Sequence, residues 1–213
     1  MRPRPTRKPP LPPKPLPTSS SSRPVSVAVT GGIGAGKSVA LEAFARHGAA
    51  TRSSDEIVHA LLRDDPEVRR ALVERFGAEA IGADGADRAA IARVVFNDSE
   101  QLQWLEQLLH PRVVQEHSKW QQELAAAPDH PLVAVTEVPL LYETGADERF
   151  DHVVVITASP EVRAARRPVD DAREQRLIPD AEKVRLADYS YVNDGTLEEL
   201  DAFVADVLAR LTA

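Results

Sequence analysis

Eight residues near the start of the chain, from Gly31 to Ser38, have the residue types and spacing of a phosphate-binding loop. They read Gly-Gly-Ile-Gly-Ala-Gly-Lys-Ser, which fits a glycine, four residues and then Gly-Lys-Ser/Thr. Glycine lets successive backbone N–H groups turn inward around phosphate oxygens. Lys37 brings a positive charge to the outer phosphates, and the Ser38 hydroxyl suits a magnesium ion that accompanies them. We expect nucleotide contacts at Gly32, Ile33, Gly34, Ala35, Gly36, Lys37, Ser38 and Val39.

Asp55 is the first of two carboxylates that follow predicted strands. It comes after a short strand at 49–53 and opens the next helix. Doubly wound sheets place their chemistry at the carboxyl ends of strands, which makes Asp55 a candidate catalytic acid. An aspartate at this place also caps helices, and Ser53 or Ser54 could cap this one. Position alone leaves both roles open.

Glu137 is the second carboxylate, and it directly follows the buried-strand run 132–136. In a chain with a phosphate loop, this is where an acid would hold water around magnesium. We therefore assign Ser38 and Glu137 to a metal site.

Four arginines fall within eleven residues: Arg163, Arg166, Arg167 and Arg173. A mobile segment that carries arginine can close over a nucleotide and neutralise charge on the phosphoryl group being transferred. A charged run of this kind is also typical of a solvated helix face. The spacing does not choose between the two.

The composition is that of a globular protein with a real core. The chain has 213 residues, of which 43% are hydrophobic and 28% charged. It has no cysteine, which excludes disulfides and thiolate metal sites and suits a cytoplasmic enzyme. No apolar run approaches the roughly 18 residues that span a membrane.

The charge is unevenly distributed. The net charge is −7, but residues 1–24 hold six basic side chains and no acid, so the remainder has 20 basic against 33 acidic residues. An acidic body argues against a nucleic-acid partner. The segment 1–24 is rich in proline and serine and nearly free of apolar residues, so we expect a disordered tail.

The predicted elements place these residues in an α/β fold. Continuous apolar strands at 25–29, 132–136 and 153–157 alternate with helices, which indicates a parallel sheet covered on both faces. The strand before the loop and the helix after it favour a phosphate site over an ordinary glycine-rich turn. Residues 66–127 are helical, as an insertion over the sheet. His110-Pro111 is expected to break that insertion's last helix or to lie in a ligand pocket.

The order of motifs resembles the dephospho-CoA kinase family over roughly residues 25–211. The resemblance rests on the loop (29–38), Ser-Asp-Glu-Ile-Val-His (54–59), Leu-Leu-His-Pro-Arg-Val (108–113), Glu-Val-Pro-Leu-Leu-Tyr-Glu (137–143), Ser-Pro-Glu (159–161) and Ala-Asp-Tyr…Asn-Asp-Gly (187–195). It implies a P-loop kinase three-layer sandwich with a parallel five-stranded sheet. The implied division is a tail (1–24), core segments (25–63, 129–160, 179–213), a helical CoA-binding insertion (64–128) and a short lid (161–178).

The resemblance also implies roles for individual residues. The family's catalytic aspartate falls on Asp55, but the first acid of its Asp-Ala-Asp motif is Ser53 here. The strand-end aspartate is replaced by the longer Glu137, and the lid arginine falls on Arg166. Asn193 and Gly195 match the loop that lies against adenine.

The implied reaction transfers the γ-phosphoryl group of ATP to the 3′-hydroxyl of dephospho-CoA, with Mg²⁺ as cofactor. Asp55, Lys37 and Arg166 are the expected catalytic residues. The expected partner is the small-molecule substrate alone, without nucleic acid or membrane, in a monomer or weak homo-oligomer. A kinase for another small acceptor and a nucleotide-dependent switch are the alternatives, although the chain lacks an Asn-Lys-x-Asp guanine signature.

Overall fold

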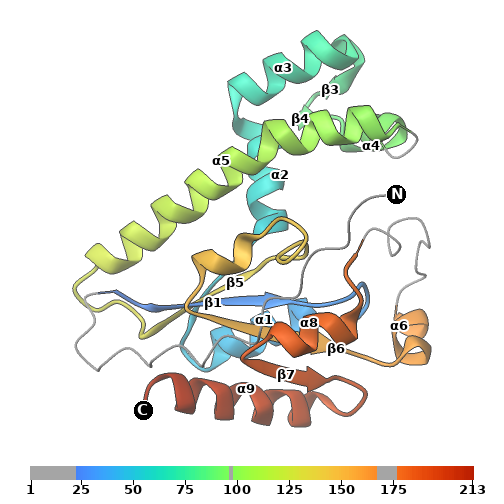
Figure 1. Cartoon of the computed structure of the whole chain (residues 1–213). Coiled ribbons are helices and arrows are strands. Elements are labelled where there is room, and N and C mark those ends of the chain that lie inside the picture. Colours follow the sequence, from blue (N-terminus) through green and yellow to red (C-terminus); the bar gives the residue numbers. More distant parts are fainter. Residues whose placement is uncertain (1–22, 96–97, 167–176) are drawn as a thin grey trace. The chain divides into compact units, whose positions relative to one another are not determined.

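The computed structural model describes residues 23–95, 98–166 and 177–213. The chain divides into two compact units (Figure 1). The first, the sheet unit, contains the described residues up to Arg52 and those from Pro128 to Ala213. The second, the helical unit, is Ser53–Ala127. Most of the predicted tail at 1–24 lies outside the described residues.

The sheet unit is built on five strands in the hydrogen-bonded order β2-β5-β1-β6-β7. Their bounds are β1 Val25–Thr30, β2 Ala50–Ser53, β5 Val133–Glu137, β6 His152–Thr157 and β7 Tyr189–Val192. The ladders that join β5, β1, β6 and β7 are all parallel. The five-stranded parallel sheet confirms the expected fold class.

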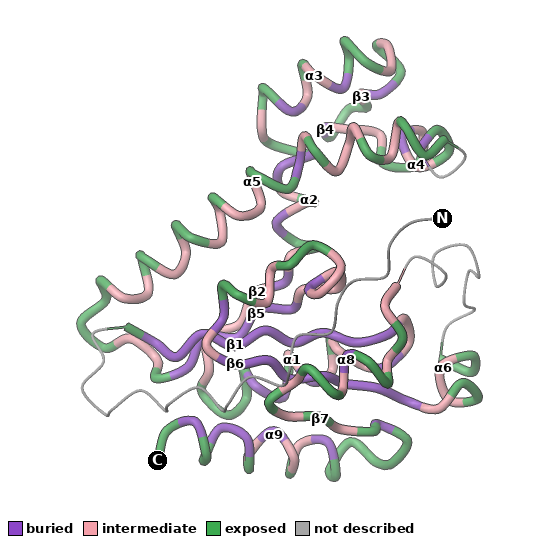
Figure 2. Tube along the Cα trace, in the orientation of Figure 1, coloured by how far each residue is buried: buried purple, intermediate pink, exposed green. Residues whose placement is uncertain are grey.

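Both faces of this sheet are buried, as Figure 2 shows for its central strands. In β6, Val154 and Ile156 belong to one apolar cluster, which also contains the buried residues of α1 and α9. Val153 and Val155 point to a second cluster on the other face, against which Val184 of α8 packs. A strand buried on both sides is apolar along a continuous run, as residues 153–156 are in β6, and such a run predicts the strand from sequence.

Four described helices and a short 3-10 turn complete the sheet unit. They are α1 Lys37–Arg46, α6 Pro160–Arg166, α8 Asp180–Leu186, α9 Leu197–Leu211 and η2 Ala146–Arg149. The apolar face of α9 is buried at Leu200, Val204, Val207, Leu208 and Leu211. Leu197 is instead 66% exposed, because it occupies the first helical position after the Thr196 cap.

The helical unit contains α2 Ser54–Asp64, α3 Pro66–Phe76, η1 Ala78–Ala80, β3 Ile81–Gly82, β4 Gly85–Ala86, α4 Arg88–Val95 and α5 Ser99–Ala126. Its core includes Ile57, Leu61 and Leu62 of α2. This unit therefore starts before the position 64 expected for the insertion, because α2 packs with the helices that follow it. A small antiparallel hairpin, β3–β4, lies between η1 and α4.

The expected helix break at Pro111 is wrong, because α5 continues through this residue. Proline removes one backbone donor and costs about 3 kcal/mol inside a helix. Leu108, Leu109 and Val113 on either side of it all pack in the core of the helical unit, which requires the helix to continue. The Arg112 guanidinium donates to the Leu108 carbonyl at 2.9 Å. His110 is exposed.

Asp151 fixes the edge of the sheet unit where β1 begins. The Arg23 guanidinium donates to its two oxygens at 2.7 and 2.9 Å, and the Ser26 amide and hydroxyl each donate at 2.9 Å. Burial alone would raise the pKa of Asp151, but these hydrogen bonds outweigh it and lower the pKa to about 2.

The lowered pKa predicts a pH-dependent contribution to stability. The ionised carboxylate stabilises the fold above its unfolded pKa of about 3.9, and this contribution is lost as pH falls toward the folded pKa of about 2. We expect Asp151→Asn to lower the free energy of unfolding by about 1–2 kcal/mol at pH 7. Urea unfolding of both proteins from pH 7 to pH 3 measures this. The gap should narrow below pH 4, and a constant gap would contradict the assignment.

Candidate active site

The phosphate loop joins β1 to α1 through a backbone that glycine alone adopts easily. Gly34 and Gly36 have φ values of 75° and 95°, in the left-handed region. A side chain at Gly36 would also collide with the amide of Asn193. The Ala35 amide donates to the Gly32 carbonyl at 3.4 Å, which closes a turn within the loop. The local sequence therefore specifies a tight loop against its neighbours.

Lys37 is the first residue of α1, and its ammonium group folds back over the loop. It donates to the carbonyls of Gly31 and Gly32 at 3.1 and 3.0 Å. Ser38 follows in the first helical turn and is exposed. A cation and the N-terminal end of a helix are thus held at the same loop, which is an arrangement that binds anions.

Asn193 lies directly after β7 and is buried, with 4% of its surface exposed. Its side-chain amide donates to the Ala35 carbonyl at 2.9 Å, and its backbone amide donates to Thr157 at 2.7 Å. Asp194 accepts from the Ser159 amide at 2.8 Å. The structure thus brings Asn193 against the phosphate loop as part of a built site, while Gly195 is exposed.

Two of the four clustered arginines are described, and both bind the phosphate loop. Arg163 donates through Nε to the Ile33 carbonyl at 2.8 Å. Arg166 donates to the carbonyls of Ala35 at 3.4 Å and Asn193 at 2.9 Å. These contacts show that neither is merely a solvated charge. Arg167 and Arg173 lie outside the described residues.

Glu137 is the last residue of β5 and is buried, with 7% exposed. Parallel pairing sets it beside Val29 of β1, two residues before Gly31. No group of three or more His, Asp or Glu side chains within the described ranges could hold a metal ion. Ser38 and Glu137 carry oxygen atoms, which are the ligand type that magnesium prefers, and their assignment to a metal site stays a prediction.

The sequence pattern missed a buried ion pair between Glu143 and Lys183. The Lys183 ammonium lies 2.9 Å from Oε1 of Glu143, and the lysine is fully buried. The same oxygen accepts from the Ile178 amide at 2.9 Å. The pair anchors the chain where α8 begins. A lysine in a short helix is usually solvated, so the sequence around Lys183 did not indicate that it is buried. Only Glu143 was marked, as the last residue of the family motif at 137–143.

Asp55 lies in the helical unit, in the first turn of α2, and it is exposed. Ser53 occupies the N-cap position, so the alternative role of Asp55 as the cap is wrong. In the described helix, the Ser53 side chain accepts no capping hydrogen bond. The Asp55 carboxylate therefore lies in the first turn of α2 without serving as its cap.

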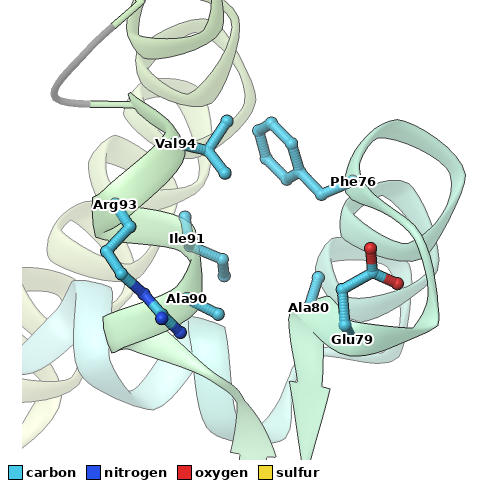
Figure 3. A pocket seen from close by; sticks show the side chains of 7 residues that line it. All are labelled: Phe76, Glu79, Ala80, Ala90, Ile91, Arg93 and Val94. Carbon is cyan, nitrogen blue, oxygen red and sulfur yellow. The ribbon is translucent and has the colours of Figure 1, made fainter.

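A cavity of about 290 Å³ lies within the helical unit, between α3 and α4 (Figure 3). Figure 3 shows Phe76 and Val94 pointing toward each other across it. Glu79 and Arg93 add charged groups to its walls. It is lined by Phe76, Glu79, Ala80, Ala90, Ile91, Arg93 and Val94.

Comparison with known proteins places this geometry in a family. The model of the dephospho-CoA kinase family matches residues 25–199, which include the loop, Asp55, Glu137 and Asn193. The chain belongs to the dephospho-CoA kinase family. Dephospho-CoA kinase of Chlorobaculum tepidum is 34% identical over 200 residues, which cover 88% of this chain and 95% of that protein.

Solved structures show the same fold. The protein TT1252 of Thermus thermophilus is 30% identical and superposes with a TM-score of 0.71, covering 90% of this chain and all of that one. Dephospho-CoA kinase from Campylobacter jejuni, at 24% identity, has the same fold with a TM-score of 0.67, covering 88% and 96%. Within the described residues, no helix is long and apolar enough to cross a membrane.

Proposed function

We propose that the chain transfers the γ-phosphoryl group of ATP to the ribose 3′-hydroxyl of dephospho-CoA, giving CoA and ADP. The observation that carries this is the family match, because it spans both units and contains the phosphate loop and Asp55 together. In the reaction the bond from the γ-phosphorus to the β–γ bridging oxygen breaks, a bond to the 3′-oxygen forms, and the hydroxyl proton leaves.

The donor side of the site lies in the sheet unit. We assign the phosphates of ATP to the amides of the loop and to Lys37, whose ammonium group already lies over that loop. Asn193 and Gly195 are assigned to the adenine side. Arg166, which donates to the carbonyls of Ala35 in the loop and of Asn193, would stabilise charge on the transferred phosphoryl group. Ser38 and Glu137 would hold Mg²⁺ and its water, and the ion neutralises phosphate charge when bound.

The acceptor side is assigned to the helical unit. Asp55 would accept the proton of the 3′-hydroxyl and orient its oxygen toward the phosphorus. Ser53 supplies no carboxylate beside it, so Asp55 would act without the first acid of the family motif. Most of the residues that line the cavity between α3 and α4 are apolar, which suits the uncharged arm of dephospho-CoA, while Glu79 and Arg93 add charged groups.

The acceptor specificity is tested by ADP release in a coupled assay with ATP and Mg²⁺. We expect turnover with dephospho-CoA at least about 100-fold above that with AMP, CMP or shikimate, because an enzyme built to bind one acceptor discriminates by transition-state binding. Mass spectrometry should find CoA as the product. Faster turnover with another acceptor would transfer the assignment to that acceptor, and acceptor-independent hydrolysis would favour a nucleotide switch.

A further inference from the structure

Arg163 links three parts of the sheet unit. It belongs to α6, its Nε donates to the Ile33 carbonyl in the phosphate loop at 2.8 Å, and its Nη1 lies 3.4 Å from Oδ2 of Asp180 in α8. Its side chain is 13% exposed. The Asp180 carboxylate therefore helps to hold a nearly buried guanidinium against the backbone of the loop.

The contact controls the direction of one peptide group. The Ile33–Gly34 peptide is trans, so the Ile33 C=O and the Gly34 N–H lie in one plane and point in opposite directions within it. Because Arg163 holds the carbonyl toward α6, the Gly34 N–H is turned the other way. In a phosphate loop, backbone amides bind the anion by pointing inward toward it, so the direction of the Ile33 carbonyl decides whether the Gly34 amide can do so.

The loop also packs closely on the backbone of α6. A Cβ atom at Gly34 would lie 3.0 Å from the Arg163 carbonyl oxygen, and Gly34 has a left-handed φ of 75°. The next tethered carbonyl, that of Ala35, is held in the same manner by Asn193 at 2.9 Å. Two carbonyls of the loop, those of Ile33 and Ala35, are thus fixed from outside by side chains far along the chain.

We propose that Arg163 is a positioning residue, which orients the Gly34 amide for the phosphates of the nucleotide by holding the Ile33 carbonyl. Arg163 acts here through its Nε–H and not by a direct charge on the phosphate. The proposal rests on the proposed function only in that the loop binds the phosphates of ATP, and it makes no use of the acceptor.

Two substitutions separate positioning from direct charge. In Arg163→Gln the side-chain nitrogen stands as many bonds from Cα as Nε does, so the donor to Ile33 is kept and the charge is lost. Arg163→Lys keeps the charge and has a carbon at the Nε position. We expect ATP affinity, measured by calorimetry with Mg²⁺, to fall about 10-fold or more in Arg163→Lys and less than about 3-fold in Arg163→Gln.

Three further variants complete the design. Arg185→Met, on an exposed arginine of α8, is the matched control and should bind ATP as the unmodified protein does. Arg163→Met should bind as weakly as Arg163→Lys. Asp180→Asn leaves Arg163 unchanged but weakens its anchor, and should cost about 2- to 3-fold. In ¹H–¹⁵N spectra without nucleotide, the Gly34 amide should move in Arg163→Lys and stay in place in Arg163→Gln.

The order of the two affinities decides the question. If Arg163→Lys binds ATP as well as or better than Arg163→Gln, the charge acts on the phosphate and the positioning role is rejected. If Arg163→Lys or Arg163→Gln does not fold, the test passes to Asp180→Asn, and an unchanged ATP affinity in that variant rejects the positioning role. Because all these readouts need ATP alone, they remain valid if another acceptor replaces dephospho-CoA in the turnover assay.

Discussion

Replacing Asp55 by asparagine is expected to reduce kcat with dephospho-CoA by about 10²–10⁴-fold, the usual contribution of a general base. Asparagine keeps the size of the side chain but cannot accept the hydroxyl proton. The KM for ATP should change less than about 2-fold, because the loop that binds the phosphates belongs to the other unit. Steady-state kinetics with each substrate varied in turn measure both values.

Glu56→Gln is the matched control for this variant. Glu56 is also an exposed acid in the first turn of α2, so its loss has the same effect on the helix N-terminus. We expect its kcat to remain within about 2-fold of the unmodified enzyme. Turnover of Asp55→Asn equal to that of Glu56→Gln would remove Asp55 from the proton-accepting role.

Lys37→Ala is expected to reduce kcat by about 10²–10³-fold and also to weaken ATP binding by about 10-fold. The ammonium group at the loop attracts the phosphates in the ground state and stabilises the charge that shifts during transfer. Stopped-flow turnover and calorimetric titration with ATP separate the two effects. Lys119→Ala, on an exposed lysine of α5, should change neither.

The outcome of Lys37→Ala also tests how the loop is held. The ammonium group donates hydrogen bonds to the carbonyls of Gly31 and Gly32. Its removal therefore takes away two hydrogen bonds within the loop as well as a positive charge. A normal rate with altered thermal stability would mean that Lys37 serves the loop's structure alone. A lower rate at unchanged stability supports the catalytic assignment.

The central strands of the sheet were predictable because burial on both faces requires a continuous run of apolar residues, which one sequence shows directly. Val153 and Val154 face opposite clusters, so both must be apolar, and the run marks the strand whichever way it faces. The loop was predictable for a related reason, since the positive φ values at Gly34 and Gly36 need glycine. In both cases the physical requirement acts on single residues and is visible in one sequence.

Features that depend on partners far along the chain were not predictable. α8 has one fully buried charge, Lys183, whose burial makes sense only beside Glu143. The continuation of α5 through Pro111 depends on core packing that outweighs a local preference. The sequence also did not predict which arginines contact the loop. Arg163 and Arg166 have the same spacing whether their side chains bind the loop or lie in solvent on a helix face.

The tethers of the phosphate loop also bear on how the protein is made. The loop is synthesised early, but two of the carbonyls that shape it wait for Arg163 and Asn193, which lie 130 and 158 residues farther along. Contacts of such sequence separation form late, after the intervening chain has been ordered. A nascent chain that has completed β1 and α1 therefore carries the phosphate-binding sequence before it has a shaped phosphate site. We therefore expect nucleotide affinity to arise only once β7 has docked, so that ATP stabilises molecules in which Asn193 already contacts the loop.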